Sequence, residues 1–151
     1  MEIITNSNLD TQKLGEALGK RAFAGMIIAL SGDVGAGKTE FTKGFTVGAN
    51  SDNATSPTFA IMNMYEGGKF PIYHFDFYRC GGDIEEFEEY IFGDGVAIIE
   101  WSELIDLPKD IIAIDIAKID DETRKITLNG NGKYEELLRG VVDEYSCHWY
   151  K

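Results

Sequence analysis

The order of apolar and polar positions predicts a chain of alternating strands and helices. In the first third of the chain, apolar residues recur at near-helical spacing and are followed by an uninterrupted apolar run at 26–30. The expected elements are a short edge strand at 2–5, a helix from about Leu9 to Phe23 capped by Asn8 or Asp10, a strand at 26–31, and a helix that ends near Gly48. Strand, loop and helix in this order predict a parallel α/β core.

The rest of the chain adds an antiparallel part. Gly67-Gly68 separates two strand-like segments, which indicates a hairpin. The expected elements are strands at 60–66, 70–78, 96–99, 111–116 and 124–128, an acidic helical stretch at 83–90, and a closing helix at 134–145. Together the patterns predict a mixed, mostly parallel sheet that is flanked by helices and includes an antiparallel hairpin portion.

Residues 32–39 read Gly-Asp-Val-Gly-Ala-Gly-Lys-Thr and directly follow the strand predicted at 26–31, which is the setting of a phosphate-binding P-loop. The three glycines let the backbone turn so that successive N–H groups point at phosphate oxygens. Lys38 can reach the β- and γ-phosphates, and the Thr39 hydroxyl is placed to bind Mg²⁺. The predicted nucleotide-binding residues are Asp33, Val34, Gly35, Ala36, Gly37, Lys38 and Thr39. We therefore expect a P-loop NTPase-like α/β fold that binds a nucleoside triphosphate.

Chain length and net charge limit the number of domains and the classes of binding partner. The 151 residues contain no internal repeat, low-complexity tract or Pro/Ser-rich linker, so we expect a single domain over 1–151. Aspartate and glutamate number 26 against 14 lysine and arginine, which gives a formal charge of −12. Autonomous binding to RNA or DNA depends on neutralising phosphates, so it is not expected, and a basic partner is favoured.

Cysteine usage and hydropathy predict a cytoplasmic protein. Cys80 and Cys147 lie far apart, form no Cys-x-x-Cys pair, and occur without a secretory signal. We therefore expect two free thiols in a reducing compartment. No apolar run approaches the ~20 residues that cross a bilayer, which predicts a soluble chain.

A second part of the site is predicted on the strand at 70–78, whose side chains alternate with a period of two. One face carries Tyr73, Phe75 and Phe77, and the other carries His74, Asp76 and Tyr78. On the polar face, Asp76 is a candidate metal-shell carboxylate or a base for an attacking water. The alternative is a half-exposed strand on which Asp76 is only solvated.

Residues 96–101, Val-Ala-Ile-Ile-Glu-Trp, form an apolar run that ends in a carboxylate, as a Walker B strand does. Glu100 at that strand end can hold Mg²⁺, directly or through water, or polarise the nucleophilic water. Ligands gather at the carboxyl ends of parallel strands, where the P-loop also lies. We therefore expect Lys38, Asp76 and Glu100 to act together in phosphoryl transfer.

Two further segments bear on the nucleotide site. One has two possible interpretations, and the other argues against a GTPase. Thr55-Ser56-Pro57-Thr58-Phe59 is either a switch-like loop that senses the γ-phosphate or a plain connecting turn. Residues 117–120, Ala-Lys-Ile-Asp, are similar to the guanine-reading motif of GTPases but lack its Asn or Thr, and the chain has no Asp-x-x-Gly. Guanine specificity therefore has little support.

Four motifs in this order, GDVGAGKT, TSPTF, YHFDFYR and IIEW, resemble the TsaE (YjeE) family, the P-loop ATPase of the bacterial threonylcarbamoyladenosine system of tRNA modification. The resemblance runs from about Thr11 to Trp101. It implies an ATPase that uses ATP and Mg²⁺ and binds the TsaB–TsaD heterodimer, whose TsaD subunit transfers threonylcarbamoyl to the adenosine beside the anticodon. ATP hydrolysis would reset that pair between cycles, and tRNA would be contacted only indirectly.

The resemblance also implies roles for single residues. Thr39 and Glu100 would hold Mg²⁺, Asp76 and Trp101 would join Lys38 in the catalytic neighbourhood, and Thr11 and Arg124 would lie near the nucleoside. The chain departs from the family at Glu40, where a second Thr is usual, at Ser102, where Pro is usual, and at Cys80-Gly81-Gly82. These departures bear on helix geometry and partner contacts more than on the phosphate chemistry.

Phosphoryl transfer depends on positioning and charge neutralisation, so the expected machinery is small. The arginines at 21, 79, 124 and 139 have no assured place at the γ-phosphate, which predicts weak ATPase activity alone and stimulation by the partner. Two alternatives belong to other classes. One is a small-molecule kinase, which would need a lid and acceptor-site arginines, and the other is a nucleotide-dependent interaction module without catalysis.

Overall fold

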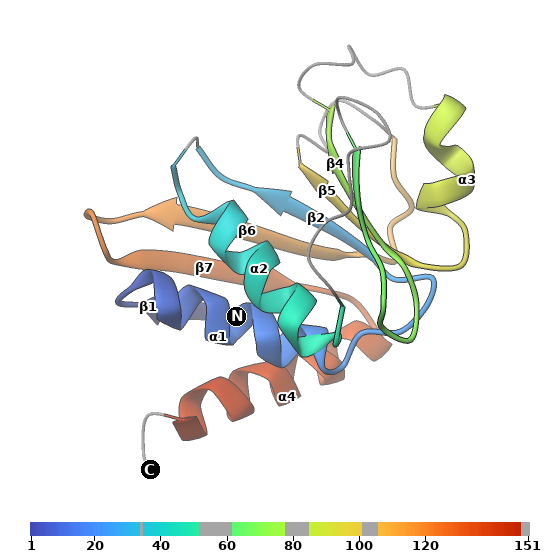
Figure 1. Ribbon diagram of the computed structural model, residues 1–151. Helices are drawn as coiled ribbons and strands as arrows, with labels where there is room; N and C mark the ends of the chain where they lie inside the picture. The colour runs from blue at the N-terminus through green and yellow to red at the C-terminus, as the bar shows by residue number, and fades with distance from the viewer. Residues whose placement is uncertain (34, 52–61, 78–84, 101–105, 149–151) are drawn as a thin grey trace.

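The computed structural model describes residues 1–33, 35–51, 62–77, 85–100 and 106–148 (Figure 1). In chain order the elements are β1 (Glu2–Thr5), α1 (Asn8–Gly19), β2 (Ile27–Ser31), α2 (Lys38–Gly48), β3 (Met62–Tyr65), β4 (Ile72–Asp76), the 3₁₀ turn η2 (Glu85–Phe87), α3 (Glu88–Ile91), β5 (Val96–Glu100), β6 (Ile112–Lys118), β7 (Arg124–Asn129) and α4 (Lys133–His148). Within these described residues the strands form one seven-stranded sheet in the order β1-β7-β6-β2-β5-β4-β3. This is the mixed α/β arrangement predicted from the sequence, with β2 at its centre.

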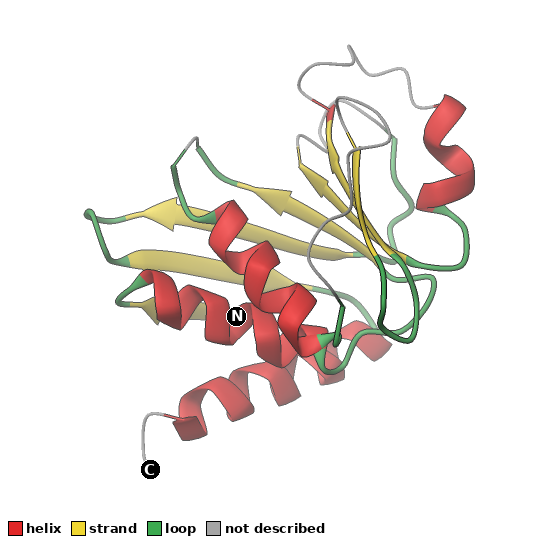
Figure 2. Cartoon of the chain, in the orientation of Figure 1, coloured by secondary structure: helices red, strands yellow, loops and turns green. Residues whose placement is uncertain are grey.

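Strand directions decide which ends of the chain segments meet. β2 pairs in parallel with both β5 and β6, and β5 pairs in parallel with β4. The hairpin predicted around Gly67 is the antiparallel β3–β4 pair, and the β6–β7 and β1–β7 pairs are antiparallel as well. Parallel neighbours end at the same edge of a sheet, so the carboxyl ends of β2, β5 and β4 lie side by side (Figure 2).

Helices cover the two faces of the sheet unequally. α1, α2 and α4 pack on one face, whereas η2 and α3 pack on the other, against β4 and β5 (Figure 1). β2 and β5 are buried up to their last residues, as their uninterrupted apolar runs require. In β6 and β7 burial alternates instead, because only one face of these strands is covered by described helices. Within the described ranges, none of the helices is both long and apolar enough to cross a membrane.

The alternation of side chains along each strand divides the core into two clusters. On β2, Ile28 and Leu30 join the cluster beneath the three longer helices, whereas Ile27 joins the cluster beneath η2 and α3. The larger cluster also contains Phe41 and Phe45 of α2, both fully buried. Each side chain of this size contributes roughly 1.5–3 kcal/mol when it leaves water. This burial fixes α2, and with it the loop that precedes α2, against β2.

The helices α1 and α2 also pack backbone against backbone. A Cβ added at Gly15 or Gly19 of α1 would collide with carbonyl oxygens of α2, and a Cβ at Gly44 or Gly48 of α2 would collide with carbonyl oxygens of α1. Residues four apart share a helix face, so each helix presents a stripe without side chains to the other. The position of α2 is therefore set by direct contact with α1 as well as by apolar packing.

The sequence prediction of the α1 cap was wrong. Ser7, rather than Asn8 or Asp10, is the N-cap: its backbone is extended, and its Oγ accepts a hydrogen bond from the Asp10 N–H at 3.1 Å. Asp10 supports the same turn, because its Oδ2 accepts from the N–H of Asn6, the residue before the cap, at 3.0 Å. A serine three residues before an acidic residue is a capping signature, and here it outweighs the polar residues that follow it.

The predicted end of α1 at Phe23 was also wrong. α1 ends at Gly19, and the N–H of Ala22 donates to the Gly19 carbonyl oxygen at 3.2 Å in the turn that follows. Phe23 nevertheless continues the apolar spacing, because its ring stacks on Tyr134 of α4 with the centroids 5.9 Å apart. Its hydrophobic character serves a contact with another helix and does not extend α1.

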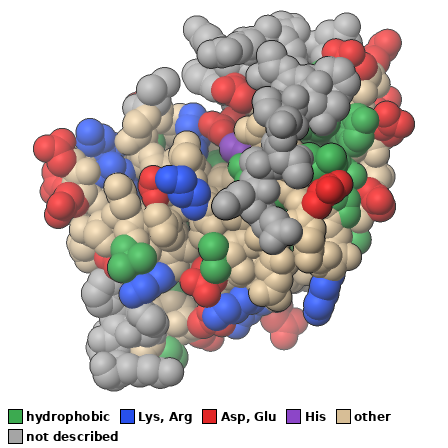
Figure 3. Space-filling model, viewed as in Figure 1, with side chains coloured by type: hydrophobic (Ala, Val, Ile, Leu, Met, Phe, Trp, Pro, Cys, Tyr) green, Lys and Arg blue, Asp and Glu red, His purple; other side chains and the backbone are tan. Residues whose placement is uncertain are grey.

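Acidic side chains gather at the end of the molecule that carries η2 and α3. The acidic stretch predicted at 83–90 forms these two elements over its described residues. Its exposed carboxylates belong to Glu85, Glu86, Glu88 and Glu89. Figure 3 shows acidic side chains at this end of the visible face. Like charges so close together repel an anionic surface, and they favour a basic one.

Candidate active site

The loop between β2 and α2 has the backbone that phosphate binding needs. Gly35 and Gly37 have φ angles of 82° and 112°, in the left-handed region that favours glycine. Gly37 is also the N-cap of α2, so no side chain caps the N–H groups of the first helical turn. Those N–H groups and the positive end of the helix dipole form a cradle for an anion. The described residues of the predicted P-loop therefore have the backbone conformation of an anion-binding loop. Val34 lies outside the described residues.

Lys38, the first residue of α2, lies between the loop and β5. Its Nζ donates to the Gly32 carbonyl oxygen at 2.7 Å and lies 3.4 Å from Oε1 of Glu100. The two side chains are only 10% and 12% exposed. A partly buried ion pair is screened far less than one on the surface, so Lys38 and Glu100 hold each other firmly at the end of the loop.

Glu100 has a second partner that sequence reasoning did not assign. His74 of β4 places its Nε2 2.5 Å from Glu100 Oε2, and its side chain is 12% exposed. The Nδ1 atom of His74 is buried and has no hydrogen-bond partner in the part of the chain that the structure describes. The period-two pattern already placed His74 on the polar face of its strand. What the sequence did not show is that β5 lies directly beside β4.

Asp76 and Glu100 end neighbouring strands and are register partners. Both side chains point to the face covered by α1, α2 and α4, because Ile72 and Ile98, an even number of residues earlier, belong to the core on that face. Both residues are partly buried. The structure thus brings the two predicted carboxylates together at the strand ends, with Glu100 in contact with Lys38.

The neighbours of Glu100 decide its charge. Burial by itself raises the pKa of this carboxyl group, but the hydrogen bond and charge of His74 and then the Lys38 ammonium lower it, and the net pKa of Glu100 lies below its usual 4.5. Glu100 is therefore an anion at neutral pH, which is the form that binds a cation or polarises water. Burial, assisted by this carboxylate, raises the pKa of Tyr65 on β3.

The lowered pKa predicts that stability depends on pH. A carboxyl group whose pKa is lower in the folded state stabilises the fold above the unfolded-state pKa, and this contribution is lost as the pH falls through the folded-state pKa. We expect the advantage of the wild type over Glu100→Gln in free energy of unfolding to shrink as the pH falls from about 7, through the usual pKa of 4.5, to about 3.5.

Guanidinium unfolding at each pH measures this difference. Glu135→Gln, on the exposed side of α4, is the matched control, and we expect its difference from the wild type to change less over the same range. A Glu100→Gln difference that stays constant from neutral to acidic pH would contradict the prediction.

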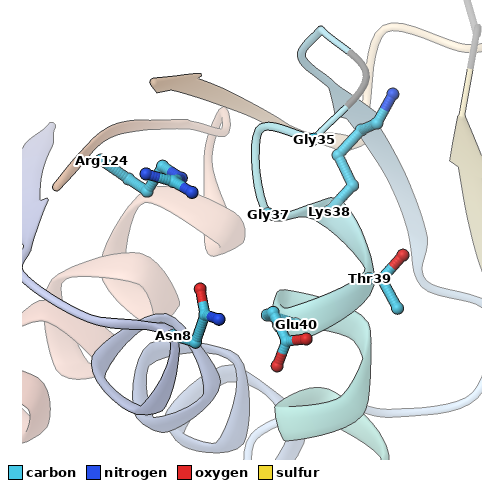
Figure 4. A pocket seen from close by; sticks show the side chains of 7 residues that line it. All are labelled: Asn8, Gly35, Gly37, Lys38, Thr39, Glu40 and Arg124. Atoms are coloured by element: carbon cyan, nitrogen blue, oxygen red, sulfur yellow. The ribbon is translucent and has the colours of Figure 1, made fainter. Parts of the chain in front are cut away.

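A cavity of about 250 Å³ lies beside the loop. It is lined by Asn8, Gly35, Gly37, Lys38, Thr39, Glu40 and Arg124. Figure 4 shows the Lys38 side chain directed away from Asn8 and Arg124, so these residues line opposite ends of the cavity. Lys38, which pairs with Glu100, therefore marks one end of the cavity, and Asn8 and Arg124 mark the other.

Arg124 and Thr11, which the resemblance placed near the nucleoside, have different surroundings. Arg124 lines the cavity and is 6% exposed, and its Nε and Nη1 donate to the carbonyl oxygens of Ala36 and Asp120 at 2.7 Å each. Thr11 is buried behind the loop, where its hydroxyl lies 2.8 Å from that of Thr5. Arg124 thus ties the loop to β7, whereas Thr11 supports the loop from α1.

Comparison with known proteins gives these features a family. The model of the family described as threonylcarbamoyl adenosine biosynthesis protein TsaE matches residues 5–126, a range that contains the P-loop, both carboxylates and Arg124. The chain belongs to the TsaE family. A Bacillus subtilis (strain 168) relative named tRNA threonylcarbamoyladenosine biosynthesis protein TsaE is 38% identical over 144 residues, which cover 92% of this chain and 89% of the relative. A Treponema pallidum (strain Nichols) relative with the same name is 34% identical over 136 residues, 85% of this chain and 99% of its own length.

A solved structure agrees with the TsaE assignment. The crystal structure of Bacillus subtilis YdiB superposes with a TM-score of 0.78 at 34% sequence identity, and the match covers 98% of this chain and 95% of that one. The fold and family expected from the four sequence motifs are confirmed. Several residues that the TsaE resemblance singled out lie outside the described residues, namely Trp101, Ser102, Arg79, Cys80 and the segment 55–59.

Proposed function

We propose that this TsaE-family chain binds and hydrolyses ATP and is required for threonylcarbamoyladenosine modification of tRNA. In this proposal it is a single domain that acts on the TsaB–TsaD pair in the cytoplasm. The observation that carries the proposal is Lys38 held 3.4 Å from Glu100 at the end of an anion-binding loop. A P-loop lysine beside a strand-end carboxylate supplies the parts that phosphoryl transfer needs. The names of the family and of its relatives support the tRNA-modification part.

Each part of the site has one task in this proposal. The loop N–H groups and the Lys38 ammonium bind the β- and γ-phosphates and stabilise charge that develops on them. Thr39 and Glu100 would hold Mg²⁺, which when bound supplies a Lewis acid for the phosphate oxygens. Asp76 orients or deprotonates the attacking water, and Trp101 belongs to the same catalytic neighbourhood. His74 keeps Glu100 in place through the hydrogen bond between them.

Low activity of the isolated chain follows from where its arginines lie. Arg21, in the turn after α1, pairs with Glu144 of α4, and Arg139 pairs with Glu135 within α4. The Nε and Nη1 atoms of Arg124 donate to the backbone carbonyl oxygens of Ala36 and Asp120. None of these three arginines, which are the ones in the described part of the chain, is placed as an arginine finger, and a finger is worth roughly 10³–10⁵ in rate. We propose that the partner supplies the missing stabilisation of the transition state.

The surface charge favours a protein partner over direct contact with tRNA. The formal charge of −12 repels phosphates, and the exposed carboxylates of η2 and α3 strengthen this repulsion at one end of the molecule. An acidic surface is complementary to a basic cleft on another protein, where it speeds association.

Steady-state assays test the proposal. We expect slow release of inorganic phosphate from ATP by the chain alone, with no phosphorylated acceptor, and a rise of at least ~10-fold when the TsaB–TsaD pair is added, because the partner completes the charge stabilisation. A pull-down with ATP, ADP or no nucleotide is the companion measurement, and association that depends on the nucleotide is the expected result. Fast turnover by the isolated chain, or transfer of phosphate to a small-molecule acceptor, would contradict the proposal.

A further inference from the structure

The layout of the site assigns a direction to a bound nucleotide. If Lys38 and Glu100 take the terminal phosphates, as the proposed function requires, the sugar must lie at the other end of the loop. There the cavity walls are formed by Asn8, Glu40 and Arg124. Glu40 brings a negative charge into a cavity that has to accept an anionic ligand.

The Glu40 carboxylate is held but has acceptor capacity left. Its Oε2 accepts a hydrogen bond from Gln12 Nε2 at 2.5 Å, and its Oε1 lies 3.4 Å from Nζ of Lys43. The Lys43 side chain is 62% exposed, whereas that of Glu40 is 21% exposed, so solvent weakens this ion pair. Each carboxylate oxygen offers two lone pairs, and within the described part of the chain these two contacts use one on each oxygen.

The orientation of Glu40 is fixed through the backbone contact of α1 with α2. Gln12, which donates to Glu40, has its own carbonyl oxygen against Gly44 one helical turn further along α2. The backbone of Gln12, from which this side chain extends, therefore cannot move away from α2 without separating the helices. A side chain that is positioned before the ligand arrives binds it at a smaller entropic cost.

The chemistry of a carboxylate limits what it can recognise here. An ionised carboxylate accepts hydrogen bonds and donates none, so it repels phosphate oxygens and attracts hydroxyl groups. The hydroxyl groups that a nucleotide presents next to its phosphates are those of the sugar. We propose that Glu40, oriented by Gln12, accepts hydrogen bonds from the ribose hydroxyls and makes this site prefer ribonucleotides over 2′-deoxyribonucleotides.

Binding calorimetry with diphosphates tests the inference without turnover. In the presence of Mg²⁺, we expect the wild type to bind ADP about 10- to 100-fold more tightly than 2′-deoxyADP, the range for a hydrogen bond to a charged group. In Glu40→Gln and Glu40→Thr this ratio should fall to roughly its square root, about three- to tenfold, because a neutral acceptor makes a hydrogen bond about half as strong. Both affinities are free to rise in these variants, because a negative charge leaves the site, so the ratio is the measured quantity.

Glu135→Gln, on the exposed side of α4, is the matched control and should keep the wild-type ratio. Thermal unfolding of each variant verifies that it is folded. Equal affinity of the wild type for ADP and 2′-deoxyADP, or a wild-type ratio in both Glu40 variants, would overturn the role of Glu40 alone. Failure of the folded wild type to bind either nucleotide would overturn the proposed function and this inference with it.

Discussion

Replacement of Lys38 by methionine is expected to lower the rate of ATP hydrolysis, measured with the TsaB–TsaD pair present, by at least ~100-fold. Methionine keeps an unbranched side chain of similar length but removes the ammonium group, together with its contacts to Gly32 and Glu100. Lys38 is only 10% exposed, so solvent screens its ammonium charge weakly. Loss of this charge should therefore raise the activation free energy more than loss of a surface charge would. Nucleotide affinity should fall as well.

The matched control for Lys38→Met lies in the same helix. Lys43→Met removes the same charge from a side chain that is 62% exposed, and we expect its rate to stay within about threefold of the wild type. Phosphate release, nucleotide calorimetry and formation of threonylcarbamoyladenosine on tRNA are the three readouts. Hydrolysis by Lys38→Met at the rate of Lys43→Met would contradict the assignment of the loop as the phosphate site.

Replacement of Gly44 by alanine is expected to lower the free energy of unfolding by about 3 kcal/mol or more. The added Cβ meets the backbone of Gln12 in α1, which cannot rotate away as a side chain can. The two helices must separate, and the apolar contacts between them are then lost. Because α2 carries Lys38 at its first turn, we also expect weaker nucleotide binding from a substitution that touches no ligand.

Gly140→Ala in α4 is the control for this prediction. The three atoms nearest to its new Cβ all belong to the guanidinium of Arg21, the closest at 3.1 Å, and that side chain can move. Alanine is also the better helix former, so Gly140→Ala should be neutral or slightly stabilising. Guanidinium unfolding monitored by circular dichroism measures both variants. Equal stability of the two variants would show that the helices tolerate a larger separation than the glycine stripes indicate.

The parts of the structure that local patterns encode were predicted well. The apolar runs at 26–31 and 96–99 gave the two central strands, because a strand buried on both faces has to be apolar throughout. The P-loop was predicted because its glycines and Lys38 are consecutive in the chain, and the alternation at 70–78 gave the correct polar face for Asp76.

The features that the sequence left out depend on which distant segments become neighbours. The His74–Glu100 bond exists because β5 lies between β2 and β4, and no local pattern sets that strand order. The same holds for the glycine stripes, since Gly15 and Gly44 have meaning only when α1 and α2 are known to touch. The Ser7 cap was missed for another reason: several polar residues compete at the start of α1, and the backbone conformation decides among them.

Local unfolding will begin at the β3–α3 end of the sheet. Among the described residues, the core at this end is the smaller cluster, its covering elements η2 and α3 are single turns, and β3 is an edge strand. β2 and α2 are enclosed by the larger cluster and open only with the whole molecule. Asp76 of β4 therefore belongs to a part of the fold that unfolds more easily than the part that carries the phosphate-binding loop. If the proposed activity is correct, local opening at this end would stop hydrolysis while the nucleotide stays bound, and a partner that docks on this end and orders it would control turnover.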